Sequence, residues 1–254
     1  MLAIDIGNTQ TTMGVFDGEE LQAVWNVATV LHRTADEHAA LLLELLGHHG
    51  LSAGDIKQVS LCSVVPPLTA IYEDMFQRYF NASLLVVAAG IKTGVRICMD
   101  NPREVGADRI VDAVAAHHLY GGLVIVVDFG TATTFDTVSE RGDYLGGAIA
   151  PGMITAAEAM SRETAMLPRF EMARPGSVIG TNTIDAMKSG IVFGYVAMVE
   201  GMVARIQREL GARAKVVATG GYAGLIAKET RAIDEVNPEL TLIGLRLVYI
   251  MNQE

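Results

Sequence analysis

The sequence DIGNTQTT at residues 5–12 has a partial copy in the middle of the chain, DFGTATT at residues 128–134. Each copy follows a short apolar run and leads into a second run that favours a strand. In such a loop an Asp carboxylate can hold Mg²⁺, a glycine lets the backbone approach a ligand, and hydroxyls and amides donate to phosphate oxygens. Two copies therefore predict two half-sites that face one nucleotide across a cleft.

A polar hairpin turn is the structural alternative, because Asp, Gly, Asn and Thr all favour turns. For one copy the two interpretations are about equally good, and the second copy favours the phosphate site. The chain has no GxGxxG fingerprint. Its nearest approach to a P-loop, Met187-Lys188-Ser189, lacks the required glycine before the lysine.

Composition narrows the class of protein. The 254 residues are 50% hydrophobic, which suits an α/β protein of one large or two smaller domains. A net charge of −10 disfavours binding to nucleic acid or to an anionic membrane surface. Cys62 and Cys98 form no CxxC pair, which indicates reduced thiols. No signal peptide is visible, and the apolar stretch 189–199 is shorter than the roughly 20 residues that span a bilayer. We expect a cytoplasmic protein.

The two halves of the chain share one predicted plan, a three-stranded meander followed by alternating helices and strands. The strands are predicted at 2–7, 11–17, 20–27, 57–64 and 84–88, and then at 123–128, 132–138, 143–149 and 216–218. Helices are predicted from Thr34 to about 49, at 66–79, up to about 119, after Pro151-Gly152, from Asn182 or Thr183 to 210, and at 239–251. With a boundary at Gly121-Gly122, this predicts a duplicated, mixed-sheet α/β architecture with domains 1–120 and 121–254.

Four motifs together resemble the type III pantothenate kinases of the acetate and sugar kinase/Hsp70/actin superfamily. They are DxGNT from residue 5, EVGADR at 104–109, DFGTAT at 128–133 and GGxIxPG at 146–152, and TGG at 219–221 resembles the superfamily's adenosine motif. The likeness covers essentially the whole chain. It implies duplicated ribonuclease H-like (actin-like ATPase) domains and ATP-dependent phosphorylation of pantothenate to 4'-phosphopantothenate, the first step of coenzyme A biosynthesis.

The resemblance also implies a role for each matching residue. ATP phosphates would be bound by Asp5, Ile6, Gly7, Asn8, Thr9, Gln10, Thr11, Thr12 and Thr131, with Asp5 oriented toward Mg²⁺. Asp128 would bind a monovalent cation, K⁺ or NH₄⁺. Pantothenate would be contacted by Gly106, Ala107, Asp108, Arg109 and Thr183, with Asp108 as the proton acceptor.

The family resemblance further implies a homodimer with the pantothenate pocket at or near the subunit interface. The family often has Tyr in the substrate pocket two residues before the Asn-Pro, and this chain has Met99 there. Methionine fills the same apolar volume without a hydroxyl.

Two other functions remain open from the sequence. The first is a non-catalytic nucleotide-binding regulatory or accessory factor of the same fold, and the second is a kinase for acetate or a sugar. From the residues alone, Asp108-Arg109 is better explained as charge at a helix N-terminus, where Asp stabilises the first turn. The presence of Asp5, Asp108 and Asp128 in one chain favours the pantothenate kinase, because a regulator could lose Asp108 freely.

Overall fold

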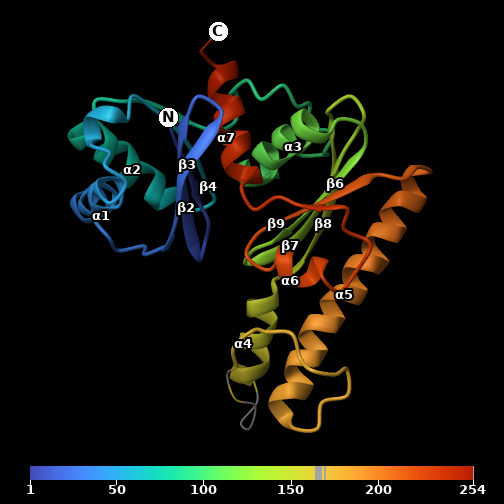
Figure 1. Ribbon diagram of the computed structural model, residues 1–254. Helices are drawn as coiled ribbons and strands as arrows, with labels where there is room; N and C mark the ends of the chain where they lie inside the picture. Colours follow the sequence, from blue (N-terminus) through green and yellow to red (C-terminus); the bar gives the residue numbers. More distant parts are fainter. Residues whose placement is uncertain (164–167, 169, 254) are drawn as a thin grey trace. The chain divides into compact units, whose positions relative to one another are not determined.

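Two five-stranded sheets organise the protein, as seen in a computed structural model that describes residues 1–163, 168 and 170–253 (Figure 1). The backbone contacts divide the chain into two units. The first unit comprises residues 1–95, 101–115 and 241–254, and the second comprises residues 96–100 and 116–240. Each sheet belongs to one unit.

The first sheet has the strand order β3-β2-β1-β4-β5. Its strands are β1 (Leu2–Ile6), β2 (Gln10–Asp17), β3 (Glu20–Ala28), β4 (Gln58–Ser63) and β5 (Ser83–Val86). The first three form the antiparallel meander, and β4 and β5 continue the sheet in parallel with β1. Strand β1 is central and is covered on both faces, which explains why its sequence is almost continuously apolar.

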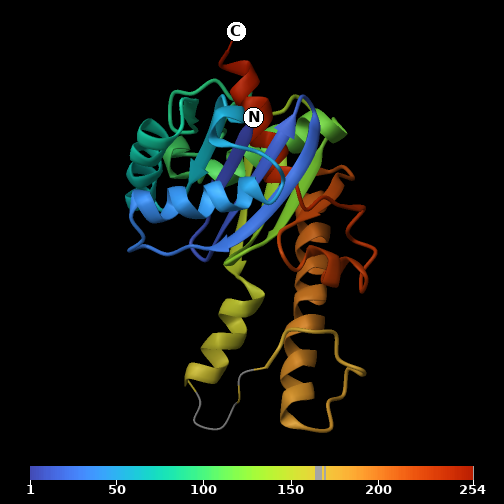
Figure 2. The ribbon, with the colours of Figure 1, turned by 60° about the vertical axis from the view of Figure 1, so that its left-hand side comes forward.

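Helices cover both faces of this sheet. On one face, α1 (Ala35–Gly47) and α2 (Pro66–Tyr79) lie next to each other and close a core that includes Leu42 and Phe76 (Figure 2). Helix α1 begins at the predicted capping box, in which the side chains of Thr34 and Glu37 bond each other's backbone amides. On the other face, α3 (Ala107–Tyr120) and α7 (Leu240–Met251) share a second core.

The second sheet repeats the first, with the order β10-β9-β6-β7-β8. Its strands are β6 (Val124–Phe129), β7 (Ala132–Val138), β8 (Tyr144–Pro151), β9 (Lys215–Thr219) and β10 (Glu235–Val236). Again a meander of three strands is extended by two parallel strands on the side of its first strand. The predicted duplication is therefore confirmed.

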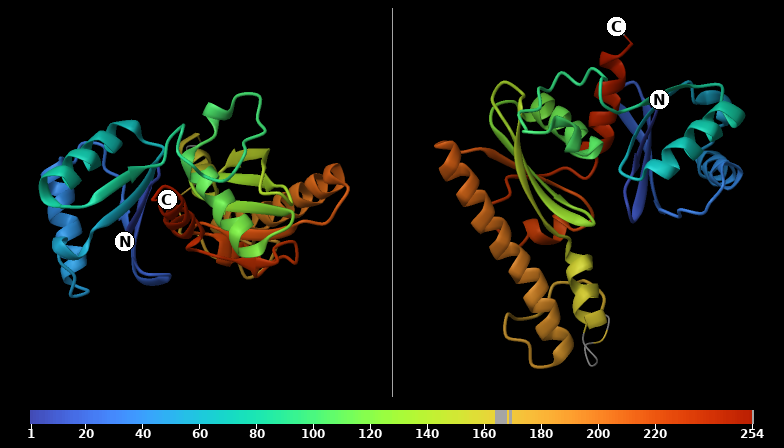
Figure 3. Two further views of the ribbon diagram at one scale, coloured as in Figure 1. Left: turned by 90° about the horizontal axis from the view of Figure 1, so that it is seen from above. Right: turned by 180° about the vertical axis from the view of Figure 1, so that it is seen from behind.

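Helices α4 (Met153–Glu163), α5 (Thr183–Leu210) and α6 (Ala223–Ala227) belong to the second unit. Helix α5 lies beside the second sheet and extends past it together with α4 (Figures 2 and 3). The side chain of Asn182 caps α5 by accepting a hydrogen bond from the Asp185 amide, and Gly211 ends the helix in the left-handed conformation.

Helix α5 is the one described helix with the length and composition that could cross a membrane. Its apolar content extends beyond the expected stretch 189–199. However, 39% of the apolar window is buried, and Val192 and Val199 lie in the core of the second unit. A core helix of a soluble protein passes the same test, so this feature is weak evidence for a membrane span.

The predicted second domain, 121–254, differs from the observed unit at both ends. Helix α7 packs with the first unit, because Leu242 and Leu245 share a core with Ala3 and Phe16. Residues 96–100 join the second unit, because Ile97 forms a bridge with Tyr144 on the edge strand β8. The short elements α6 and β10 have no counterpart in the sequence prediction.

Candidate active site

Two carboxylates of the first unit, Asp5 and Asp108, influence each other. Asp5 lies near the end of β1 between Thr12 of β2 and Cys62 of β4. Dense packing and the negative charge of Asp108 raise the pKa of Asp5 to about 7, although the Cys62 thiol opposes this by donating a hydrogen bond to Asp5 Oδ1 at 3.2 Å. Asp5 therefore carries only part of a negative charge near neutral pH.

The Cys62 side chain is completely buried. Burial and the charges of Asp5, Asp108 and Asp112 raise the pKa of its thiol well above the usual value. All three carboxylates thus raise the pKa of the same thiol. Cys62 stays a neutral thiol in this environment and serves Asp5 as a hydrogen-bond donor.

Asp108 occupies the first turn of α3, where the helix N-terminus stabilises a carboxylate. Its Oδ1 accepts a hydrogen bond from the Arg109 amide at 2.8 Å. The position therefore agrees with the alternative of simple helix-end charge. That alternative does not account for the proximity of Asp5, because two like charges disfavour each other's ionised form unless a cation neutralises them.

The first loop, residues 7–10, is closed by a hydrogen bond from the Gly7 amide to the Gln10 carbonyl, 3.0 Å long. The side chains of Asn8, Thr9 and Gln10 are exposed. Those of Ile6 and Thr11 are buried, and the Thr11 hydroxyl bonds Thr29 Oγ1 at 3.0 Å. Because the side chains of Ile6 and Thr11 are buried, the phosphate contacts predicted for these two residues can be made only by their backbone atoms. The exposed side chains of the neighbouring residues remain the other candidates.

Three sequence motifs, at residues 128–134, 146–152 and 219–221, meet at the second loop. Asp128 pairs with Thr219 across β6 and β9, so the motifs 128–134 and 219–221 meet within the second unit. Gly220 has φ +85°, and a Cβ atom there would meet the Asp128 carboxylate and the backbone of Phe129. Glycine is therefore required at 220 for this close approach. Gly152, from the motif 146–152, donates its amide to the Thr131 carbonyl at 3.0 Å.

The residues expected to contact pantothenate fall in both units. Gly106, Ala107, Asp108 and Arg109 belong to the first unit, whereas Met99 and Thr183 belong to the second. Met99 packs over Gly146, where a Cβ would lie 3.2 Å from the Met99 sulfur. That these residues form one substrate site stays a prediction.

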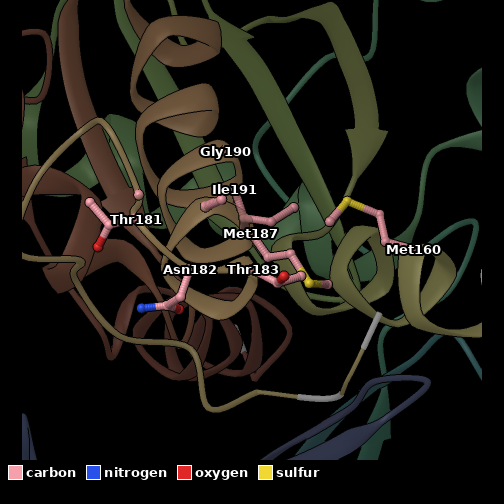
Figure 4. A pocket seen from close by; sticks show the side chains of 9 residues that line it. Met160, Thr181, Asn182, Thr183, Met187, Gly190 and Ile191 are labelled. Carbon is pink, nitrogen blue, oxygen red and sulfur yellow. The ribbon is translucent and has the colours of Figure 1, made fainter. Parts of the chain in front are cut away.

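Thr183 begins α5 and is exposed. It lines a pocket of about 670 Å³ with residues of the preceding loop, of α5 and of α4 (Figure 4). The side chains of Met160, Met187 and Ile191 supply the apolar part of its wall, and Asn182 and Thr183 supply polar groups.

Among the described residues, no group of three or more His, Cys, Asp and Glu side chains could hold a metal ion. Mg²⁺ is commonly held in proteins by one or two carboxylates together with phosphates. The mutual repulsion of Asp5 and Asp108 suits such a cation. Asp128 offers a hard oxygen ligand of the kind that K⁺ accepts.

The model of the family described as type III pantothenate kinase matches residues 1–205. The chain belongs to the type III pantothenate kinase family. Family members of that name are 58% identical in Dehalococcoides mccartyi, with 100% of this chain and 98% of the relative covered. In Moorella thermoacetica the identity is 52%, with 99% of each chain covered, and in Myxococcus xanthus it is 51%, with 99% and 98% covered.

Solved structures with low sequence identity share the fold. A conserved putative Baf family transcriptional activator from Campylobacter jejuni has a TM-score of 0.61 at 16% identity, with 100% of this chain and 99% of that chain covered. A putative 2-dehydro-3-deoxygalactonokinase from Sinorhizobium meliloti has a TM-score of 0.60 at 13% identity, with 98% and 95% covered. Together with the two repeated mixed sheets, these likenesses confirm the predicted fold class of duplicated ribonuclease H-like domains.

The family model and the names of the relatives identify the chain as a kinase. Thr29 and Thr155 contact the two acidic loops and are absent from the sequence prediction. The sequence signal was only a hydroxyl residue directly after the third strand in one meander and about four positions after it in the other, which is too common a pattern to single out.

Proposed function

We infer that this protein transfers a phosphoryl group from ATP to pantothenate and forms 4'-phosphopantothenate in the first step of coenzyme A biosynthesis. The observation that carries this function is full-length identity of 50–58% to relatives named type III pantothenate kinase. A non-catalytic regulator is not favoured, because the resemblance to the putative transcriptional activator is at 16% identity and concerns the fold alone.

Asp108 is proposed as the group that accepts the proton of the pantothenate hydroxyl. In phosphoryl transfer, positioning and charge neutralisation matter most. Asp5 is proposed to hold Mg²⁺, which when bound neutralises negative charge on the phosphates. Asp5 would then lose its proton more readily, because a nearby cation favours the carboxylate.

The exposed part of each loop is proposed to bind the phosphates of ATP. In the first loop this part is Asn8 to Gln10, followed by the half-buried Thr12, and in the second loop it is Thr131. Asp128 is proposed to bind K⁺ or NH₄⁺. Support for this role comes from the close packing of Gly220 on the Asp128 carboxylate, which joins the adenosine motif to the second loop.

We also propose a cytoplasmic homodimer in which α5 contributes to the contact. Gly190, Gly194 and Ala197 are exposed on this helix, and small side chains let two backbones approach closely. Sedimentation equilibrium tests the dimer, and we expect it to give the mass of two chains. A mass of one chain at all concentrations would contradict it.

A coupled assay of ADP release tests the reaction. We expect ADP release with pantothenate and not with acetate or glucose, and we expect it in K⁺ or NH₄⁺ but not in Na⁺ alone. Equal rates in K⁺ and in Na⁺ would remove Asp128 from its proposed role.

Asp108→Asn tests the proton acceptor. The variant should bind ATP normally and lose about 100-fold or more in kcat, the usual contribution of a general base. Glu73→Gln is the matched control, since Glu73 is an exposed carboxylate on α2. Near-normal turnover by Asp108→Asn would exclude Asp108 as the base.

A further inference from the structure

The chain that leaves β3 holds the first loop in place. Thr29 follows the last residue of this strand and makes three hydrogen bonds to residues 7–11. Its amide donates to the Thr9 carbonyl at 3.0 Å, and its hydroxyl donates to the Gly7 carbonyl at 2.8 Å. Its Oγ1 also lies 3.0 Å from the buried hydroxyl of Thr11. One side chain thus contacts both ends of the loop.

The chain that leaves β8 holds one carbonyl of the second loop, that of Thr131. The Gly152 amide donates to the Thr131 carbonyl at 3.0 Å, as the Thr29 amide does to the Thr9 carbonyl. The Thr155 hydroxyl, on the first turn of α4, donates to the same Thr131 carbonyl at 2.8 Å. β3 and β8 are the third strands of the two meanders, so the two arrangements correspond in the duplicated topology.

We propose that Thr29 and Thr155 are positioning residues that fix the two phosphate loops in the conformation that binds ATP. The proposal rests on the proposed function in one respect, that the loops bind phosphate. Neither threonine lies in the quoted motifs, and neither is assigned a contact with a substrate.

The physical reason is the geometry of the peptide bond. A trans peptide directs its carbonyl and its N–H to opposite sides. When Thr29 holds the carbonyls of Gly7 and Thr9, the N–H groups of Asn8 and Gln10 are fixed on the side away from Thr29. The carbonyl oxygens, which would repel a phosphate, are thereby kept away from it, and the amides need no reorganisation when a nucleotide binds.

The same argument applies to the second loop, where the held carbonyl of Thr131 fixes the Ala132 N–H. Thr29 is partly buried and Thr155 is exposed. Water can replace the Thr155 hydroxyl more easily, so its removal should matter less.

Thr29→Val and Thr29→Ser form the first test pair. Valine keeps the branched shape and removes the hydroxyl, whereas serine keeps the hydroxyl. By titration calorimetry with MgATP and without pantothenate, we expect the Val variant to raise the Kd about three- to tenfold, the usual effect of one hydrogen bond. The Ser variant should stay within about twofold of the wild type, and the KM for pantothenate should not change in either variant.

Thr93→Val is the matched control in the first unit, because the Thr93 hydroxyl bonds only locally to Val95. In the second unit the test is repeated with Thr155→Val, for which we expect a rise in the Kd of about twofold to threefold, and with Thr155→Ser. Thr230→Val is the control there, because the Thr230 hydroxyl bonds Glu200 and Ala232 and not the second loop. Because Thr155 is exposed, Thr155→Val should fold even if Thr29→Val does not.

A wild-type Kd in both Val variants would overturn the proposal, and so would equal losses in the Val and Ser variants. A second readout needs no ligand: the ¹⁵N order parameters of residues 7–10 should fall in Thr29→Val and not in Thr93→Val. If the wild type bound no ATP, the proposed function would be wrong. Unchanged order parameters in Thr29→Val would refute only the positioning role.

Discussion

The raised pKa of Asp5 gives a quantitative prediction about stability. The perturbation is Asp5→Asn, which replaces a carboxyl group with a neutral amide of the same shape. In the folded protein the pKa of Asp5 is about 7, against an ordinary value of 3.8. Between these two pH values the native state holds a proton that the unfolded state lacks, so the free energy of unfolding falls as pH rises through this window and levels off above it.

The magnitude follows from the size of the shift. Each pKa unit corresponds to about 1.4 kcal/mol, so the whole shift of roughly three units is worth about 4 kcal/mol. Between about pH 5 and the folded-state pKa of about 7, the difference in bound protons persists over about two pH units. This corresponds to a loss of about 3 kcal/mol in the free energy of unfolding. Asp5 is partly exposed, and solvent screening reduces the expected loss to about 2 kcal/mol. Asp5→Asn should not show this loss.

Urea unfolding without nucleotide and with a chelator is the suitable assay. Trp25 is the single tryptophan of the chain and lies in the core of the first unit, so its fluorescence follows the unit that contains Asp5. The difference in stability between Asp5→Asn and the wild type should grow by about 2 kcal/mol from about pH 5 to about pH 8. Glu73→Gln removes an exposed carboxylate and is the control.

A stability difference that does not change with pH would refute this reasoning, since it would mean that Asp5 is ionised in both states. A second variant locates the cause. Asp108→Asn removes a neighbouring negative charge, so it should lower the pKa of Asp5 and make the wild-type pH dependence smaller.

Three further predictions concern single contacts. Cys62→Ala removes the thiol donor to Asp5 and should raise the pKa of Asp5 further, measured by NMR titration of the carboxyl carbon; a lower pKa would contradict the role of Cys62. Asn182→Ala removes the cap of α5 and should lower the free energy of unfolding of the second unit by about 1 kcal/mol; an unchanged free energy would contradict the role of the cap. Gly220→Ala places a Cβ against Asp128 at positive φ and should weaken activation by K⁺; an unchanged K⁺ dependence would separate Gly220 from the cation site.

Much of the fold was predictable because the local signals agree with the tertiary structure. The capping box at Thr34, the two prolines at the start of α2 and the Asn182 cap all mark helix ends that the structure confirms within one or two residues. The repeat of an acidic turn after an apolar strand predicted the duplication, because both copies end the first strand of a meander.

The site was predictable only in part. Thr11 carries a hydroxyl like its neighbours, and sequence spacing gave no sign that strand alternation would bury it against Thr29. The effect of Asp108 on Asp5 required knowledge of how α3 packs on the sheet, since 103 positions separate the two residues in the chain. The packing of Leu242 and Leu245 places α7 in the first unit, and this packing joins segments that are far apart in the chain. No boundary signal near Gly121-Gly122 could reveal it.

By itself, the sequence determined the two acidic loops, the duplicated order of elements and the family resemblance, since each depends on residues close together along the chain. Only the tertiary structure decided which side chains of those loops are exposed, how strongly Asp5 holds its proton and which threonines fix the loops. These properties depend on burial and on contacts between distant segments, and neither is encoded in a local pattern of residues.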